Sequence, residues 1–389
     1  MKETVREPSS LLNDHAAQQH ANVFMRAFSY PASQLPVNFE KDVELADRVM
    51  LMDGIGFIFE LCEREQKVAA KAADLEKWIT GHVVRKGVKR IQNTRELLGA
   101  YMGLSLVNHF GHRTMAAPKE PDAFVSMIIY RVPQKSRAFR AARFKKSRNG
   151  SFVHVLRDAD YFEICDHFVT PAEMLDYFSF RRDVLLSWDP PSTAVSEAAL
   201  IGQYLMEDYS SPPDARFERA ALSRGGPTAC EFSFVLDTLA SKIAAQEGDS
   251  ADTDCYEILS ELALLGRYEL RALKLELRMA LESVRANKFE LPYRIVSGRT
   301  GCGIIILPVT SEFHDRAFDA LHSLSLASKY ELDLERQVGV GMAQSGDFVD
   351  IEWILLEGDN PPDPYLEKRL AYNYPFRRAS EQWMRPIFT

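Results

Sequence analysis

Two apolar runs separated by an Asp-Gly pair constrain the fold of this chain more than any other local pattern. Residues 48–52 are Arg-Val-Met-Leu-Met and residues 55–62 are Ile-Gly-Phe-Ile-Phe-Glu-Leu-Cys, with Asp53 and Gly54 between them. Asp-Gly is a preferred pair for a two-residue β-hairpin turn, because both positions must tolerate a positive φ. We therefore expect residues 48–62 to form an antiparallel hairpin.

The length of this turn also determines which residues of the two strands face each other. With two residues in the turn, Met52 pairs with Ile55, and counting outward places Asp47 opposite Glu60. Directly opposed residues have Cβ atoms about 4.5–5.5 Å apart, so two carboxylates there repel unless a cation lies between them. Cys62 shares a face with Glu60, because side chains alternate along a strand. Either the two acids hold a divalent cation, or Asp47 only begins a strand and Glu60 is a rim carboxylate.

A long helix is expected after the hairpin, over residues 74–101. Its apolar residues recur at helical spacing and form one stripe, made of Val84, Val88, Ile91 and Leu98. Other helices are expected over residues 11–28, 160–168, 171–186, 196–206, 231–245, 254–287 and 312–328. Other strands are expected over residues 124–132, 151–156, 293–296, 303–309, 338–342 and 348–356.

Two adjacent prolines, Pro190 and Pro191, give the strongest signal for a domain boundary. Proline ends a preceding helix and favours an extended link. We therefore expect one domain over residues 1–190 and a second, α+β domain over residues 191–389, whose role the sequence does not indicate.

Basic residues are concentrated in two runs, although the chain as a whole has a formal net charge of -8. Residues 77–95 and residues 131–148 contain no aspartate or glutamate. Such asymmetry indicates either a surface that binds nucleic-acid phosphates or solvated faces that acidic neighbours balance in the fold.

The hairpin and the helix after it resemble the core of the PD-(D/E)XK nuclease superfamily, over roughly residues 40–160. That core has an acid opening one strand, a hairpin, and an acid-x-lysine sequence on the next strand; Asp47 and Glu60 match the two acids. The basic helix is similar to one found in several bacterial branches, with Lys86, Lys89 and Gln92 at the matching positions. The resemblance implies an α/β restriction-endonuclease-like domain, a mixed sheet flanked by helices, in which Asp47 and Glu60 bind Mg²⁺ or Mn²⁺.

One position departs from the pattern of that superfamily. Cys62 occupies the place of the lysine that activates water and stabilises charge on the phosphate, and a neutral thiol cannot supply that charge. Three explanations remain open: the domain is a degenerate relative that does not cleave, Lys86 or Lys89 reaches the site from the helix, or only the fold is shared.

The sequence thus predicts metal-dependent phosphodiester hydrolysis, or nucleic-acid binding by a degenerate nuclease-like domain. The basic residues expected to follow the nucleic-acid backbone are Lys135, Arg137, Arg140, Arg143, Lys145, Lys146 and Arg148. The alternative is a non-enzymatic interaction or scaffold protein with the same fold.

Location is predicted from what the sequence lacks. The longest apolar stretch, residues 303–309, is far short of the roughly 20 residues that cross a bilayer, and the first residues lack the apolar segment of a secretory signal. Five scattered cysteines show no zinc-type spacing. We therefore expect a cytoplasmic protein without membrane association.

Overall fold

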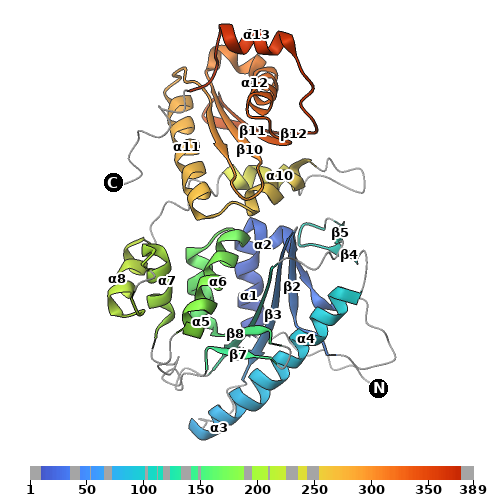
Figure 1. Cartoon of the computed structure of the whole chain (residues 1–389), viewed down its shortest axis with the longest axis vertical. Coiled ribbons are helices and arrows are strands. Elements are labelled where there is room, and N and C mark those ends of the chain that lie inside the picture. Colours follow the sequence, from blue (N-terminus) through green and yellow to red (C-terminus); the bar gives the residue numbers. More distant parts are fainter. Residues whose placement is uncertain are drawn as a thin grey trace. The chain divides into compact units, whose positions relative to one another are not determined.

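A computed structural model describes most of the chain, which divides into two compact units, Met1–Gly226 and Pro227–Thr389. Figure 1 shows the helices and strands of the two units. The described residues are 10–35, 44–52, 54–64, 72–100, 104–111, 113–116, 123–132, 142–147, 150–187, 195–208, 211–224, 235–242 and 254–377.

The first unit is built around a six-stranded mixed sheet, in the order β1-β2-β3-β6-β8-β7. Its strands are β1 (Ser29–Pro31), β2 (Arg48–Met52), β3 (Ile55–Glu63), β6 (Ala123–Arg131), β7 (Phe144–Lys146) and β8 (Phe152–Arg157). A separate two-stranded sheet pairs β4 (Leu104–Val107) with β5 (Arg113–Ala116). The helices are α1 (Ser10–Ala21), α2 (Val23–Phe28), η1 (Ala32–Gln34), α3 (Ala72–Trp78), η2 (Ile79–Val84), α4 (Arg85–Ala100), α5 (Asp158–His167), α6 (Pro171–Ser187), α7 (Glu197–Met206) and α8 (Ala215–Arg224).

The predicted hairpin is confirmed, with the predicted register. Strands β2 and β3 are antiparallel, Met52 lies opposite Ile55, and Arg48 lies opposite Phe59. Gly54 has a φ of 72°, as the turn requires. Strand β1 pairs antiparallel with β2, whereas β6 is parallel to β3 and β8 is parallel to β6. The crossover from β3 to the parallel β6 runs through the helix α4, so the hairpin, the helix and the strands β6 and β8 occur in the predicted order. Strands β4, β5 and β7, which lie between them in the chain, were not predicted.

The predicted helix over residues 74–101 is present and contains a π-helical segment. Helix α3 continues through the π-helical η2 into α4 without a break. The wider turn changes which residues face the sheet, because each of its hydrogen bonds spans five residues. Val84 and Val88 are only partly buried, and the fully buried stripe consists of Val83, Gly87, Ile91, Thr94 and Leu98.

Two predicted helices are interrupted by local capping. Residues 11–28 form α1 and α2, because the Asn22 side chain accepts hydrogen bonds from the N–H groups of Phe24 and Met25 and begins a new helix. Residues 254–287 also form two helices, because the Gly266 N–H donates to the Glu269 side chain at 2.8 Å.

Helices cover both faces of the six-stranded sheet (Figure 1). On one face, Val83 of η2 and Ile91 of α4 pack in one apolar cluster with Ile58 of β3 and Ile128 of β6. On the other face, Phe59 of β3 contacts residues of α1 and α5. The first unit is therefore a mixed sheet flanked by helices, as the sequence predicted.

The second unit contains a four-stranded sheet in the order β12-β11-β10-β9. Strands β10 and β11 are parallel, and the two outer pairs are antiparallel. The strands are β9 (Tyr293–Val296), β10 (Gly303–Val309), β11 (Arg336–Ser345) and β12 (Phe348–Glu357). The helices are α10 (Asp254–Ala263), α11 (Arg267–Arg285), η4 (Ser311–Arg316), α12 (Ala317–Glu331) and α13 (Pro364–Tyr372), and residues 235–242 are also helical.

The predicted boundary at residue 190 falls among residues outside the described ranges. Helices α7 and α8, which follow it, belong to the first unit, and α7 packs on α5 and α6. The first unit therefore continues beyond the double proline. Of the helices in the described part of the chain, none is both long and apolar enough to cross a membrane.

Candidate functional site

Asp47 and Glu60 lie next to each other at the edge of the β2–β3 hairpin. Asp47 directly precedes β2, and its backbone N–H donates to the Phe59 carbonyl at 3.0 Å. Its carboxylate Oδ2 accepts the Leu61 N–H at 2.7 Å, so the side chain lies along β3 at the level of Glu60. The printed pairing of β2 with β3 ends at Arg48 and Phe59, and these two hydrogen bonds hold Asp47 beside β3 where the pairing ends.

Glu60 is almost fully buried, with 1 % of its surface exposed. Its Oε1 accepts a hydrogen bond from Arg90 Nη1 at 2.7 Å and a weak one from Cys62 Sγ at 3.8 Å. Its Oε2 is buried and has no hydrogen-bond partner among the described residues. One carboxylate oxygen in the interior is therefore left without the interaction that normally offsets its desolvation.

The electrostatics of both acids follow from this burial. Burial and the neighbouring Asp47 charge raise the pKa of Glu60 to about 8, although Arg90 acts in the opposite direction. Burial also raises the pKa of Asp47, against the Leu61 N–H and Arg90. Burial and the Asp47 charge thus oppose ionisation of Glu60, whereas the ion pair with Arg90 favours it.

Arg90 is the cation of the site, and sequence reasoning missed it. Its Nη1 binds the buried Glu60, while its Nε binds Glu44 Oε2 at 3.1 Å. One helical turn earlier, Gly87 lets α4 approach the strand closely, because a Cβ there would lie 3.3 Å from Glu60 Cγ. Gly87, Arg90 and Thr94, at i, i+3 and i+7, share the face that also carries Ile91, and that spacing is the signal that would have found Arg90.

The segment that carries the first acid is fastened to the same helix. Asn93 Nδ2 donates to the Glu44 carbonyl at 2.9 Å, and the Ala46 N–H donates to Thr94 Oγ1 at 2.9 Å. Helix α4 thus holds residues 44–46 beside β3, and this contact positions Asp47.

Lys86, Lys89 and Gln92 do not contact the two acids. Lys86 and Lys89 are exposed on α4, and Gln92 is half-buried. The charges of both lysines help to lower the pKa of Glu44, so the two side chains lie near that carboxylate. Arg90, not a lysine, binds Glu60 from the helix.

Cys62 shares the face of Glu60, as the alternation of the strand predicted. Its thiol contacts Glu60 Oε1, and the side chain is also part of the apolar cluster that includes Ile58 and Tyr130. Burial, together with the nearby Glu60 and Asp47, raises the pKa of the thiol. Cys62 is therefore a neutral group that brings no positive charge to the site.

Asp47 and Glu60 are the residues that could hold a divalent cation of the kind the resemblance implies. Mg²⁺ is usually bound by one or two protein carboxylates, with water and substrate oxygens as the other ligands. Asp47 and Glu60 supply two carboxylates, and Glu60 Oε2 is an unpartnered buried acceptor. In the described part of the chain, no group of three or more His, Cys, Asp or Glu side chains could hold a metal, so substrate or water would complete the coordination.

The second basic run is only partly described. Lys135, Arg137, Arg140 and Arg148 lie outside the described residues. Lys145 and Lys146 are exposed on β7, the edge strand of the sheet. Arg143, which immediately precedes β7, is buried.

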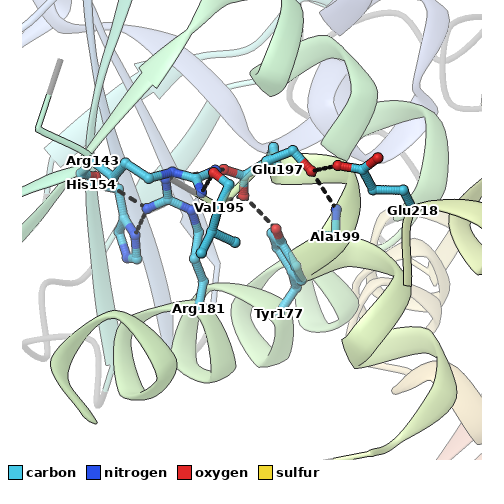
Figure 2. A network of polar contacts seen from close by, with 9 residues as sticks. Arg143, His154, Tyr177, Arg181, Val195, Glu197, Ala199 and Glu218 are labelled. Atoms are coloured by element: carbon cyan, nitrogen blue, oxygen red, sulfur yellow. Dashed lines mark hydrogen bonds and ion pairs between the residues drawn. The ribbon is translucent and has the colours of Figure 1, made fainter. Parts of the chain in front are cut away.

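Arg143 belongs to a buried ionic network around Glu197 (Figure 2). Glu197, in the first turn of α7, reaches between Arg143, Arg181 and Tyr177, and each of the three donates a hydrogen bond to its carboxylate. Arg181 Nε lies 2.8 Å from Oε1, and Nη2 lies 3.2 Å from Oε2. Arg181 also donates to His154 Nδ1 at 2.9 Å, so this histidine nitrogen is unprotonated.

This network corrects the expected role of Arg143. Burial alone would raise the pKa of Glu197, but Arg181 and Arg143 outweigh it and lower the pKa to about 2. The Glu197 carboxylate is therefore ionised, and both of its oxygens accept hydrogen bonds. Arg143 joins β7 to α7 inside the unit, and its guanidinium does not face a nucleic-acid backbone.

The second unit has an apolar groove between α12 and α13, with a volume of about 790 Å³. Its floor includes Leu324, Leu366 and Leu370, and its rim carries Arg316, Lys368 and Arg369. Among the described residues, Asp319 is the one carboxylate that lines the groove, so the groove does not offer the pair of acids found in the first unit.

Comparison with known proteins adds no relative: no protein-family model, no curated protein and no solved structure matches this chain.

Proposed function

We propose that the first unit is a restriction-endonuclease-like domain that binds nucleic acid and hydrolyses its phosphodiester bonds with a divalent cation, Mg²⁺ or Mn²⁺. The observation that carries this proposal is the juxtaposition of Asp47 and Glu60 on the hairpin, with Glu60 Oε2 buried and unpartnered. The parallel pairing of β3 with β6 through α4 supports it, because the resemblance implies this order of elements.

Each residue has a role in this proposal. Asp47 and Glu60 hold the cation, which when bound polarises the phosphate and lowers the pKa of a water molecule. Arg90, held by Glu60, supplies the positive charge that Cys62 lacks. Lys86 and Lys89, exposed on the same helix, attract the phosphate backbone.

Nicking of supercoiled plasmid and cleavage of single-stranded RNA by the purified full chain, with Mg²⁺ or Mn²⁺, test the hydrolysis. We expect wild-type cleavage, and a loss of at least a hundredfold in Asp47→Asn and Glu60→Gln. Asp74→Asn is the matched control, because it removes one exposed carboxylate from α3. Failure of the wild type to cleave any substrate with either metal would contradict the hydrolase.

A second candidate function, nucleic-acid binding without hydrolysis, is favoured by two contacts at the same site. The Arg90 guanidinium already offsets the charge of Glu60, and Cys62 stands where the superfamily has its lysine. Cys62→Lys separates the two candidates, because its ammonium would reach the buried Glu60. In a degenerate site it should create or raise cleavage, whereas in an active site, where Arg90 supplies the charge, it should not increase the rate.

The displaced-lysine explanation has its own prediction. If Lys86 or Lys89 acts at the reacting phosphate, its alanine variant should abolish cleavage, while Cys62→Ala changes little. If Arg90 acts instead, each lysine variant should weaken binding modestly, and Arg90→Ala should abolish cleavage.

A further inference from the structure

The exposed carboxylate of Glu44 forms an ion pair with Arg90, the arginine of the candidate site. The Glu44 side chain is 64 % exposed, yet its Oε2 lies 3.1 Å from Arg90 Nε. The same guanidinium is fixed from the other side by the buried Glu60, at 2.7 Å. Arg90 therefore has one permanent partner in the interior and one partner at the surface.

Positive charge surrounds this surface carboxylate. Arg90, by hydrogen bonding and by charge, and then Lys86 and Lys89, by charge, lower the pKa of Glu44. Both lysines are exposed on α4. Arg90 thus binds the Glu44 carboxylate directly, and the two lysines lie close enough on α4 to act on it through their charge.

The backbone of Glu44 is held independently of its carboxylate. Asn93 donates to the Glu44 carbonyl, and Thr94 accepts the N–H of Ala46. The carboxylate can therefore leave Arg90 by side-chain rotation alone, without movement of α4. Solvent and salt screen an exposed ion pair of this kind, so it adds little to stability and a stronger anion can displace it.

We infer that Arg90, Lys86 and Lys89 form a phosphate-binding site, and that Glu44 is an internal anion which an incoming nucleic-acid phosphate displaces. A phosphate diester presents two charged oxygens to the guanidinium, as the carboxylate does, and arginine binds both groups with the same fork of donors. Displacement breaks the Glu44–Arg90 ion pair and keeps the Arg90–Glu60 pair. The inference rests on the proposed function for the class of ligand, and it does not depend on hydrolysis.

The test is binding of a short fluorescein-labelled single-stranded DNA to the full chain, measured by fluorescence anisotropy in EDTA at low salt. Glu44→Gln should raise the affinity about fivefold, because the competing anion is lost. The matched control is Glu96→Gln, which removes one exposed carboxylate from α4, the helix that carries Arg90. It should change the affinity by less than about twofold.

A double-mutant cycle shows whether the gain acts through Arg90. In an Arg90→Gln background, Glu44→Gln should give no further gain, because no ion pair remains to be released. Equal effects of Glu44→Gln and Glu96→Gln, or an undiminished gain without Arg90, would overturn the inference. Retained circular dichroism shows that the variants are folded.

The outcomes also separate this inference from the proposed function. Binding that follows the cycle, with no cleavage by any variant, overturns hydrolysis alone. Cleavage without a gain in Glu44→Gln overturns the internal-anion role alone. No detectable binding by any folded variant overturns both the phosphate site and the nucleic-acid ligand.

Discussion

Two buried glutamates of the first unit, Glu60 and Glu197, meet arginine side chains and yet have opposite electrostatics. Glu197 accepts hydrogen bonds on both oxygens from two arginines and a tyrosine, and its pKa falls to about 2. Glu60 has one arginine, one weak thiol contact and a bare Oε2, and its pKa rises to about 8. The difference lies in how completely each carboxylate is satisfied, since both side chains are buried.

This contrast distinguishes a structural charge from an available one. A saturated ion pair has no remaining capacity for a ligand, and breaking it is costly because it leaves charges buried without partners. An incompletely satisfied carboxylate lowers stability, but it can accept a proton or a cation. The Glu197 network therefore joins elements of the fold, and Glu60 is the better candidate for chemistry.

The largest expected effect is that of Glu197→Gln. Removal of this charge leaves Arg143 and Arg181 buried without an anion, so we expect a loss of about 3–5 kcal/mol in local stability. Hydrogen–deuterium exchange of peptides from α6 and α7 should show the loss. Because the folded pKa of Glu197 lies below its ordinary value, its stabilisation is full above about pH 4.5 and is lost as the pH falls through 2. The difference in stability between Glu197→Gln and wild type should therefore become smaller as the pH falls toward 2.

Glu60→Gln should have the opposite sign and the opposite pH dependence. The pKa of Glu60 is raised from 4.5 to about 8, so wild type loses stability as the pH rises from about 5 to 9. Glutamine does not titrate, so the variant should gain on the order of 3 kcal/mol relative to wild type over that interval. Thermal unfolding in EDTA at several pH values measures this gain, with the exposed Glu76→Gln as control. A difference independent of pH would contradict the assigned environment of Glu60.

Tyr177→Phe tests how much one of the three donors contributes to the satisfied carboxylate of Glu197. The Tyr177 hydroxyl donates to Glu197 Oε1, and a hydrogen bond to a charged group contributes about 1.5–3 kcal/mol. We expect a loss in that range in the exchange protection of α7, smaller than the loss in Glu197→Gln, because both arginines keep their anion. Unchanged protection would show that the two arginines alone satisfy the carboxylate.

Gly87→Ala tests how closely α4 must approach Glu60. A Cβ at this position would lie 2.8 Å from Ile128 Cδ1 and 3.3 Å from Glu60 Cγ, so we expect a net loss of about 1 kcal/mol despite the better helix propensity of alanine. Gly81→Ala is the control, because nothing lies within 4 Å of its new Cβ. The control should be neutral or slightly stabilising, and equal effects in the two variants would contradict close packing at Gly87.

The sequence predicted the hairpin, its register and the order of the elements after it, because these depend on turn chemistry and alternation within a short segment. Asp-Gly predicted the turn, and alternation predicted that Cys62 shares the face of Glu60. The register does not extend to Asp47, which hydrogen bonds with Phe59 and Leu61 hold beside β3. Which residues of α4 face the sheet was harder to predict, because a π-helical segment precedes α4 and rotates the helix face that points to the sheet.

The polar partners could not be predicted, because they depend on contacts between segments far apart in the chain. Arg143 occurs in a run of basic residues that indicates a nucleic-acid surface, yet it pairs with Glu197, 54 residues later. Arg90 binds Glu60, which lies 30 residues earlier in the chain. Nothing in the sequence favours Arg90 over the neighbouring basic residues Lys86 and Lys89 for this contact. Charge composition alone does not separate a buried cation from an exposed one.

The two lysines of β7 have a consequence for how the protein behaves in solution. Strand β7 is one margin of the six-stranded sheet, and Lys145 and Lys146 are exposed on it. The opposite margin, β1, has only three residues and ends at Pro31. An unpaired strand can recruit another chain into its hydrogen-bond ladder, and short strands, lysine and proline hinder that addition. Both margins are therefore protected against self-association, so replacing the two lysines with apolar residues should promote aggregation even if nucleic-acid binding is unchanged.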